Sequence, residues 1–141
     1  MDQGTHRSVV LLPIHQEYAE AILSGRKRVE LRKTRFGRHV SHVLLYVTSP
    51  LRRIVGYFEV KGVSEAAPSA LWRRYRHDVG VSKQAFDTYF GGNKRGVAIG
   101  VGRVRHFGRH VRLDEIGVRA PQSFVYLSPS AFDALCCMAQ A

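Results

Sequence analysis

Short apolar runs separated by polar or glycine-containing turns make up most of this chain, a pattern typical of strands. Residues 8–12 and 43–47 are continuous apolar runs, as in strands that are buried on both faces. In residues 28–32, Val29 and Leu31 alternate with charged side chains, which predicts a strand with one buried face. Further strands are predicted over residues 54–63, 97–101 and 123–127.

Helical spacing occurs between these runs. In residues 16–24, Tyr18 and Ile22 lie four positions apart on one apolar face, and Gly25 follows where a helix commonly ends in a left-handed conformation. The other predicted helices are residues 68–77, residues 82–90 with Ser82 as N-cap, one turn at residues 113–116, and a C-terminal helix that starts at Ser128 and Pro129.

These strands and helices do not alternate regularly, which argues against a Rossmann-like parallel sheet. Six short strands with helices between them predict an α+β fold, a small closed or nearly closed β-barrel with helices packed around it. A chain of 141 residues suits one core. We expect a flexible N-terminal leader at residues 1–7 and a single domain over residues 8–141 that includes the C-terminal helix.

The charge of the chain points to an anionic partner. The net charge is +11 and the isoelectric point is about 10.4, which favours phosphate-bearing partners and predicts binding that weakens with salt. A generally basic surface is the alternative, but residues 26–38 concentrate seven cations around one carboxylate, Glu30. On the predicted strand Glu30 lies between Arg28 and Arg32 on one face, so it either holds a basic neighbour or accepts a hydrogen bond from a ligand. The seven cations are Arg26, Lys27, Arg28, Arg32, Lys33, Arg35 and Arg38.

Cysteine and histidine positions limit the chemistry further. Cys136 and Cys137 are adjacent, so a bridge between them is strained and we expect a reducing, cytoplasmic location. No apolar run approaches the roughly 18 residues of a membrane span, and the N-terminus lacks the apolar region of a signal peptide. We expect no membrane association, no metal and no other cofactor, because neither histidine pair has a third ligand at suitable spacing. The pairs are His39 with His42 and His106 with His110.

Motifs along the chain follow a recognisable order. Residues 14–32 read Ile14-x-x-Glu17-Tyr18-Ala19-x-x-Ile22-Leu23-Ser24-Gly25-x-Lys27-x-x-Glu30-x-Arg32. Three segments follow: Tyr46-Val47-Thr48-Ser49-Pro50, Val55-Gly56-x-Phe58-Glu59-Val60 and Pro121-Gln122-Ser123-Phe124-x-Tyr126-Leu127. The ordered set resembles the ASCH domain family of the PUA-like superfamily, in its small stand-alone bacterial and archaeal form. The run from Gly25 to Arg32 is the most specific part.

The resemblance implies a PUA-like barrel with a cleft between the first helix and the barrel, where members bind RNA or another nucleic acid. It implies that Lys27 and Glu30 line this cleft with Arg32 alongside. Relatives often carry a lysine where this chain has His15, which is mostly neutral at pH 7. The weaker candidates for the cleft lining are His15, Ser49, Gln122, Ser123 and Phe124.

The leading hypothesis is a protein that binds RNA, as single strands or unpaired bases, in this basic cleft. Lys27 and Glu30 would contact a base or a phosphate. The alternative interpretation is that they form a surface salt bridge that contributes little to stability. The other cations of residues 26–38, Lys33 included, would contact backbone phosphates or simply form a solvated face.

Catalysis is the alternative hypothesis, from a different class. A small hydrolase would act on RNA or on a modified nucleoside, as a ribonuclease or an N4-acetylcytidine amidohydrolase, with Lys27 and Glu30 as its polar pair. The related amidohydrolases carry a threonine where this chain has Glu30, and a carboxylate does not copy a hydroxyl nucleophile. We therefore favour binding over catalysis. A regulatory module that senses a small nucleotide and contacts a protein partner is the third hypothesis.

Overall fold

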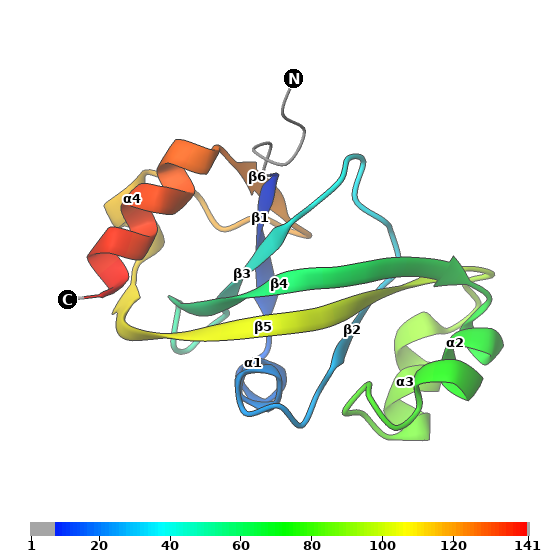
Figure 1. Cartoon of the computed structure of the whole chain (residues 1–141). Helices are drawn as coiled ribbons and strands as arrows, with labels where there is room; N and C mark the ends of the chain where they lie inside the picture. The colour runs from blue at the N-terminus through cyan, green and yellow to red at the C-terminus, as the bar shows by residue number, and fades with distance from the viewer. Residues whose placement is uncertain (1–7, 141) are drawn as a thin grey trace.

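A computed structural model describes residues 8–140 and shows an α+β fold built on one six-stranded sheet (Figure 1). The strand order is β2-β5-β4-β3-β1-β6, with β1 parallel to β3 and every other neighbouring pair antiparallel. The strands are β1 (Val9–Ile14), β2 (Val29–Arg32), β3 (His42–Val47), β4 (Arg53–Ala66), β5 (Gly96–Val111) and β6 (Val125–Leu127).

The helices begin and end close to the predicted positions. Ser82 and Ser128 each accept a hydrogen bond at 3.1 Å from a backbone amide of the first turn, as N-caps do. The helices are α1 (Gln16–Leu23), α2 (Pro68–Tyr75), α3 (Lys83–Phe90), α4 (Pro129–Ala139) and a 3₁₀ helix η2 (Leu113–Ile116). The predicted leader at residues 1–7 lies outside the described residues.

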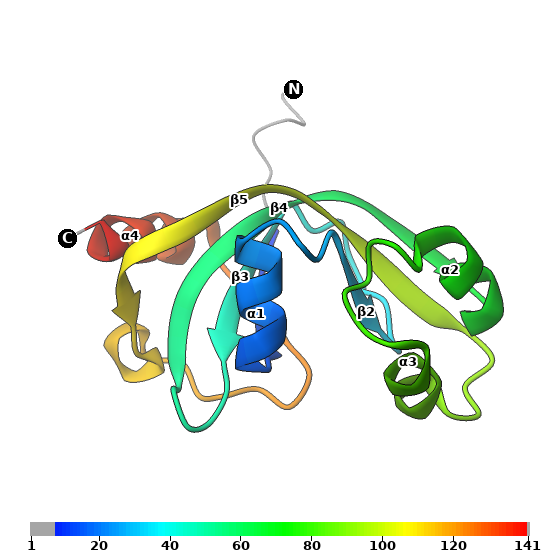
Figure 2. The same ribbon diagram turned by 90° about the horizontal axis from the view of Figure 1, so that it is seen from below.

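The sheet is barrel-like but open. Among residues 8–140, the edge strands β2 and β6 do not pair with each other, so the closed form of the predicted barrel is corrected to a strongly curved sheet. Figure 2 shows β5 arching over α1. The predicted α+β class is confirmed.

The strands β4 and β5 are longer than their predicted lengths of residues 54–63 and 97–101. They pair from Ile54 opposite Val111 to Ala66 opposite Gly96, with three register shifts on the way. Each shift breaks the two-residue alternation of side chains. Residues 103–106 are also exposed, so this stretch carries no apolar signal for a strand.

Three clusters of buried side chains position the helices. One cluster packs α1 against one face of the sheet, and a second packs α4 against the other face near β1 and β3. The third packs α2 and α3 against β2 and β5, at the end of the sheet opposite α4 (Figure 1). The edge strand β2 therefore runs between α1 and α3, as both views show.

Candidate functional site

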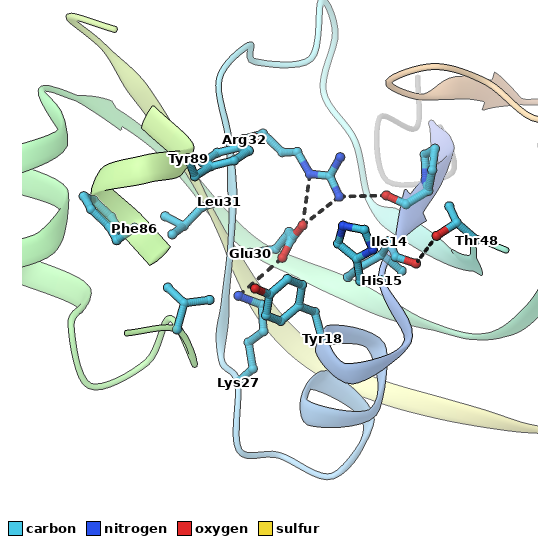
Figure 3. A pocket seen from close by; sticks show the side chains of 12 residues that line it. Ile14, His15, Tyr18, Lys27, Glu30, Leu31, Arg32, Thr48, Phe86 and Tyr89 are labelled. Atoms are coloured by element: carbon cyan, nitrogen blue, oxygen red, sulfur yellow. Dashed lines mark hydrogen bonds and ion pairs between the residues drawn. The ribbon is translucent and has the colours of Figure 1, made fainter. Parts of the chain in front are cut away.

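A cleft of about 370 Å³ opens along β2, between the start of α1 and the helix α3. Aromatic side chains form both walls, with Tyr18 on α1 facing Phe86 and Tyr89 on α3 (Figure 3). The alternation of β2 explains its floor, because Val29 and Leu31 pack toward the α2–α3 cluster and the even positions turn toward α1. The lining is Pro13, Ile14, His15, Tyr18, Lys27, Glu30, Leu31, Arg32, Thr48, Val81, Phe86 and Tyr89.

A chain of charged groups crosses the floor of the cleft. Lys27 and Glu30 are 2% and 5% exposed, and they are the buried polar residues of the described chain. One carboxylate oxygen of Glu30 lies 3.4 Å from Lys27 Nζ, and the other accepts from Arg32 Nη2 at 2.7 Å and Nε at 3.0 Å. Arg32 Nη2 also donates to the Pro13 backbone oxygen at 2.9 Å. The burial excludes the alternative of a surface salt bridge for Lys27 and Glu30.

The loop between α2 and α3 encloses Lys27. Its ammonium donates to the backbone oxygen of Val79 at 2.5 Å and lies 5.4 Å from the centre of the Tyr18 ring. Gly80 has a φ of +65°, and a Cβ built there would lie 3.0 Å from Lys27 Cβ. The Asp78 backbone oxygen accepts from the amides of Arg28 and Val29 at 2.7 and 3.0 Å, so the loop is fixed to the start of β2.

Burial decides the electrostatics of the cleft. It lowers the pKa of Lys27 from 10.5, and the nearby Glu30 carboxylate opposes this effect without cancelling it. Burial also raises the pKa of the Tyr89 hydroxyl. Two cations against one carboxylate leave one net positive charge on the floor, and a lysine with a lowered pKa is suited to move a proton as well as to attract an anion.

Some of the predicted site residues meet in this cleft. His15, Lys27, Glu30 and Arg32 line it, and Lys33 lies at its rim with Nζ 5.0 Å from the centre of the Tyr89 ring.

The other predicted cations lie elsewhere. Arg28 was expected on the face of Glu30, but β2 begins at Val29 and the exposed Arg28 precedes the alternation; Lys27 takes that place. Arg26 donates to Ser24 Oγ at 3.0 Å, Arg35 pairs with Glu65 at 3.4 Å, and Arg38 stacks on Tyr126 with its guanidinium 3.9 Å from the ring centre.

The weaker candidates for the lining also lie outside the cleft, apart from His15. Ser49 is exposed, and its neighbour Thr48 lines the cleft instead. Gln122 and Ser123 are exposed. Phe124 packs edge-on against Phe36, at 5.0 Å between ring centres, and so belongs to the core.

The aromatic walls are what sequence reasoning missed. Tyr18 belongs to the quoted motif, and Phe86 and Tyr89 lie three positions apart on one helix face, which reads equally well as core. Only the packing of α3 opposite α1 shows that these rings face a common space.

Two classes of site find no support in residues 8–140. These residues contain no group of three or more side chains placed to hold a metal ion. None of their helices combines the length and the apolar character that crossing a bilayer requires.

Comparison with known proteins identifies the family and the relatives of this chain. The ASCH domain family model matches residues 12–99. The ribosomal protein uL22 of Ureaplasma parvum is 32% identical over 102 residues, which cover 72% of this chain and 33% of that protein. This chain thus spans about a third of the length of that relative.

A second relative matches over most of both lengths. The ASCH domain-containing ribonuclease of Zymomonas mobilis is 28% identical over 127 residues, covering 86% of this chain and 85% of that protein. The crystal structure of ASCH from Zymomonas mobilis superposes with a TM-score of 0.85 at 24% identity, over 92% of this chain and 94% of the other, and shows the same fold. The chain therefore belongs to the ASCH domain family.

Proposed function

We propose that this protein binds RNA, as single strands or unpaired bases, in the cleft between α1 and α3. The observation that carries the proposal is the Lys27–Glu30–Arg32 chain on the floor of an aromatic-walled cleft, in which Lys27 and Glu30 are buried and Arg32 is half-buried. Burying charges costs free energy unless they are paired, and these three side chains together keep one net positive charge. A net charge of +11 supports a polyanionic partner.

The dimensions of the cleft favour a base over a duplex. A volume of about 370 Å³ lies near the lower end for ligand sites. Unpaired bases stack on aromatic rings, and Tyr18 and Tyr89 offer rings on opposite walls. A double helix buries its bases in its own stack and has no group to insert here.

Each charged residue has a distinct role in this proposal. Glu30 is a positioning residue, because its two oxygens are bound by Lys27 and Arg32 and it does not present a free carboxylate to a base. Arg32 uses Nε and Nη2 within the protein and makes no bond through Nη1 to any residue from 8 to 140. Its Nη1 and the third proton of the Lys27 ammonium are the donors available to a ligand.

Two relatives support RNA as the partner. One is named a ribosomal protein and the other a ribonuclease. We also propose a cytoplasmic location, which agrees with the adjacent positions of Cys136 and Cys137, because a bridge between neighbouring cysteines is strained.

Binding of fluorescent single-stranded RNA, duplex RNA and single-stranded DNA across a salt series tests the proposal. We expect single-stranded RNA to bind with the highest affinity, and we expect this affinity to fall as the salt concentration rises. Tyr89→Ala should weaken binding about fivefold or more, since losing one stacking ring costs about 1–3 kcal/mol. Tyr57→Ala is the matched control, because Tyr57 lies on β4 outside the cleft.

The variant Lys27→Ala, Glu30→Gln should abolish cleft binding, and thermal unfolding will show whether it still folds. Absence of binding by the wild type to every polymer would refute the proposal.

RNA cleavage is the second candidate function, favoured by the ribonuclease relative and by the lowered pKa of Lys27. His15 lies in the same cleft as Lys27, so two groups that exchange protons line one space. Incubation of the same RNAs with the protein, followed by gel analysis, tests this candidate. Cleavage lost in both Lys27→Ala and His15→Ala would support catalysis in this cleft. Intact RNA at saturating protein would contradict it.

An N4-acetylcytidine amidohydrolase is not supported by the site, because Glu30 stands where that chemistry needs a hydroxyl.

A further inference from the structure

We infer that a second hollow, separate from the cleft, binds the sugar-phosphate backbone of the single strand whose base occupies the cleft. This basic hollow is lined by Arg28, Lys61 and Arg74 over a floor that includes Gly62 and Gly100, and its volume is about 800 Å³. It lies beside α2, which contributes Arg74 and Tyr75 to its lining. The inference rests on the proposed function of the cleft.

The cations of the basic hollow are available to a ligand. Arg28, Lys61 and Arg74 are exposed, and none of them forms an ion pair with a described residue. Asp78 is the one carboxylate among the described residues that line the hollow, so the cations stay in excess. Phosphates take guanidinium and ammonium donors from different segments, and these three cations come from the start of β2, from β4 and from α2.

The floor of the basic hollow is bare backbone. At Gly62 a Cβ would meet no atom within 4 Å, and no positive φ requires glycine there. Glycine in a strand interior is less stabilising than alanine, and neither a close neighbour nor a positive φ requires it at Gly62, which borders one of the register shifts between β4 and β5. Glycine lets a ligand approach the protein backbone closely. A site for the sugar-phosphate backbone of RNA needs such close approach.

The basic hollow adjoins the cleft. Lys27 lines both, and Arg28 follows it directly, with the amide of Arg28 fixed to the Asp78 oxygen at 2.7 Å. Adjacent nucleotides in an extended strand lie within the reach of two adjacent residues and their side chains. A strand that places a base in the cleft can therefore lay its neighbouring phosphates over Arg28 and the glycine floor.

The test separates the basic hollow from the cleft by the size of the ligand. A single fluorescent ribonucleoside, which has no phosphate, probes the cleft alone, and a twelve-nucleotide single strand also reaches the hollow. The hollow variant is Arg28→Gln, Lys61→Gln, Arg74→Gln. The control variant is Arg105→Gln, Arg119→Gln, Lys94→Gln, which removes the same charge from exposed residues outside both sites. Affinity is measured by fluorescence anisotropy over a salt series, after thermal unfolding has confirmed that both variants fold.

We expect the hollow variant to bind the twelve-nucleotide strand at least tenfold more weakly than the control variant does. Its salt slope should be shallower by about 2, since each lost phosphate contact removes about 0.7 from the slope for single strands. Binding of the ribonucleoside should be the same in the hollow variant and in the control variant. Equal affinity and slope in the two variants, or equal losses for the ribonucleoside and the strand, would overturn the inference. If neither ligand binds the wild type, the proposed function of the cleft fails first.

Discussion

The cleft and the basic hollow take two adjacent cations, Lys27 and Arg28, from one segment, yet the two cations differ in burial and pairing. In the cleft, Lys27 is 2% exposed and is tied to Glu30 and Val79. In the hollow, the next residue, Arg28, is exposed and has no ion-pair partner in the described chain. Buried cations must be paired because isolated charges are costly away from water, whereas exposed cations keep their hydration and need no partner.

Because of this difference, we expect the cleft to select which group binds and the basic hollow to attract phosphates of any sequence. A fixed set of paired charges between aromatic walls can distinguish one inserted group from another, since its donors do not move. Exposed cations attract any phosphate and contribute affinity without a choice of sequence. Changes in the two regions should therefore differ in what they damage: folding and selectivity in the cleft, salt-dependent affinity in the hollow.

The largest expected effect is on Glu30. Glu30→Ala leaves Lys27 and Arg32 without their carboxylate inside the protein, and removing one partner of a buried ion pair costs about 3–5 kcal/mol. Urea unfolding measures this change in the free energy of unfolding. Asp87→Ala is the control, since its pair with Lys83 is exposed on both sides and should cost about 0–1 kcal/mol. Equal losses in the two variants would show that burial of the Glu30 pair is not what sets its cost.

The next effect concerns the loop that encloses Lys27. Gly80 and Gly117 have φ values of +65° and +68°, but only a Cβ at Gly80 meets a neighbour, Lys27 Cβ at 3.0 Å. Alanine in a left-handed conformation costs about 1–2 kcal/mol, so Gly117→Ala should lose that amount. Gly80→Ala should lose about 1 kcal/mol more through the close contact, and it should also weaken RNA binding.

Thermal unfolding and RNA anisotropy on this pair of variants measure both effects. A loss of RNA binding in Gly117→Ala, or none in Gly80→Ala, would contradict the role assigned to the loop.

A smaller effect is the pH dependence that Lys27 contributes. Because the pKa of Lys27 is lowered in the folded protein, the unfolded chain binds more protons between that lowered pKa and 10.5. Stability should therefore rise with pH in this window relative to Lys27→Met, which cannot titrate. Urea unfolding of both proteins between pH 7 and pH 10 tests the sign. The exposed Lys83→Met serves as control, and a wild-type curve parallel to that of Lys27→Met would refute the prediction.

The smallest effect on stability is expected in the floor of the basic hollow. Gly62→Ala adds a methyl group where no described atom lies within 4 Å, so it should leave the free energy of unfolding unchanged or raise it by up to about 1 kcal/mol. The same methyl group should reduce the affinity for the twelve-nucleotide strand. Unchanged affinity with intact stability would show that the backbone at this position does not contact RNA.

Local signals predicted most elements but not the lengths of the long strands. The alternation of Val29 and Leu31, and the caps at Ser82 and Ser128, depend on residues within one turn or one strand, so they can be read directly. The lengths of β4 and β5 could not be predicted from the sequence, because bulges break the alternation of side chains and the exposed residues beyond Val101 show no apolar periodicity.

The candidate site divides in the same way. The Lys27, Glu30 and Arg32 positions follow from the family motif, which is a short continuous segment. The expectation that Arg28 shares their face failed, because the strand begins one residue later than the charge pattern suggests. The dispersal of Arg26, Arg35 and Arg38 to separate surfaces depends on partners such as Glu65 and Tyr126, which are distant in sequence.

By itself the sequence determined the family, the α+β class, the excess of positive charge and the charged residues of the site, since all of these follow from local patterns and from composition. Only the tertiary structure decided which lysine is buried, which rings face each other across β2, and which cations remain unpaired. The physical reason is that burial and pairing depend on segments brought together by folding. The loop after α2 covers Lys27, and that contact spans 52 residues of sequence.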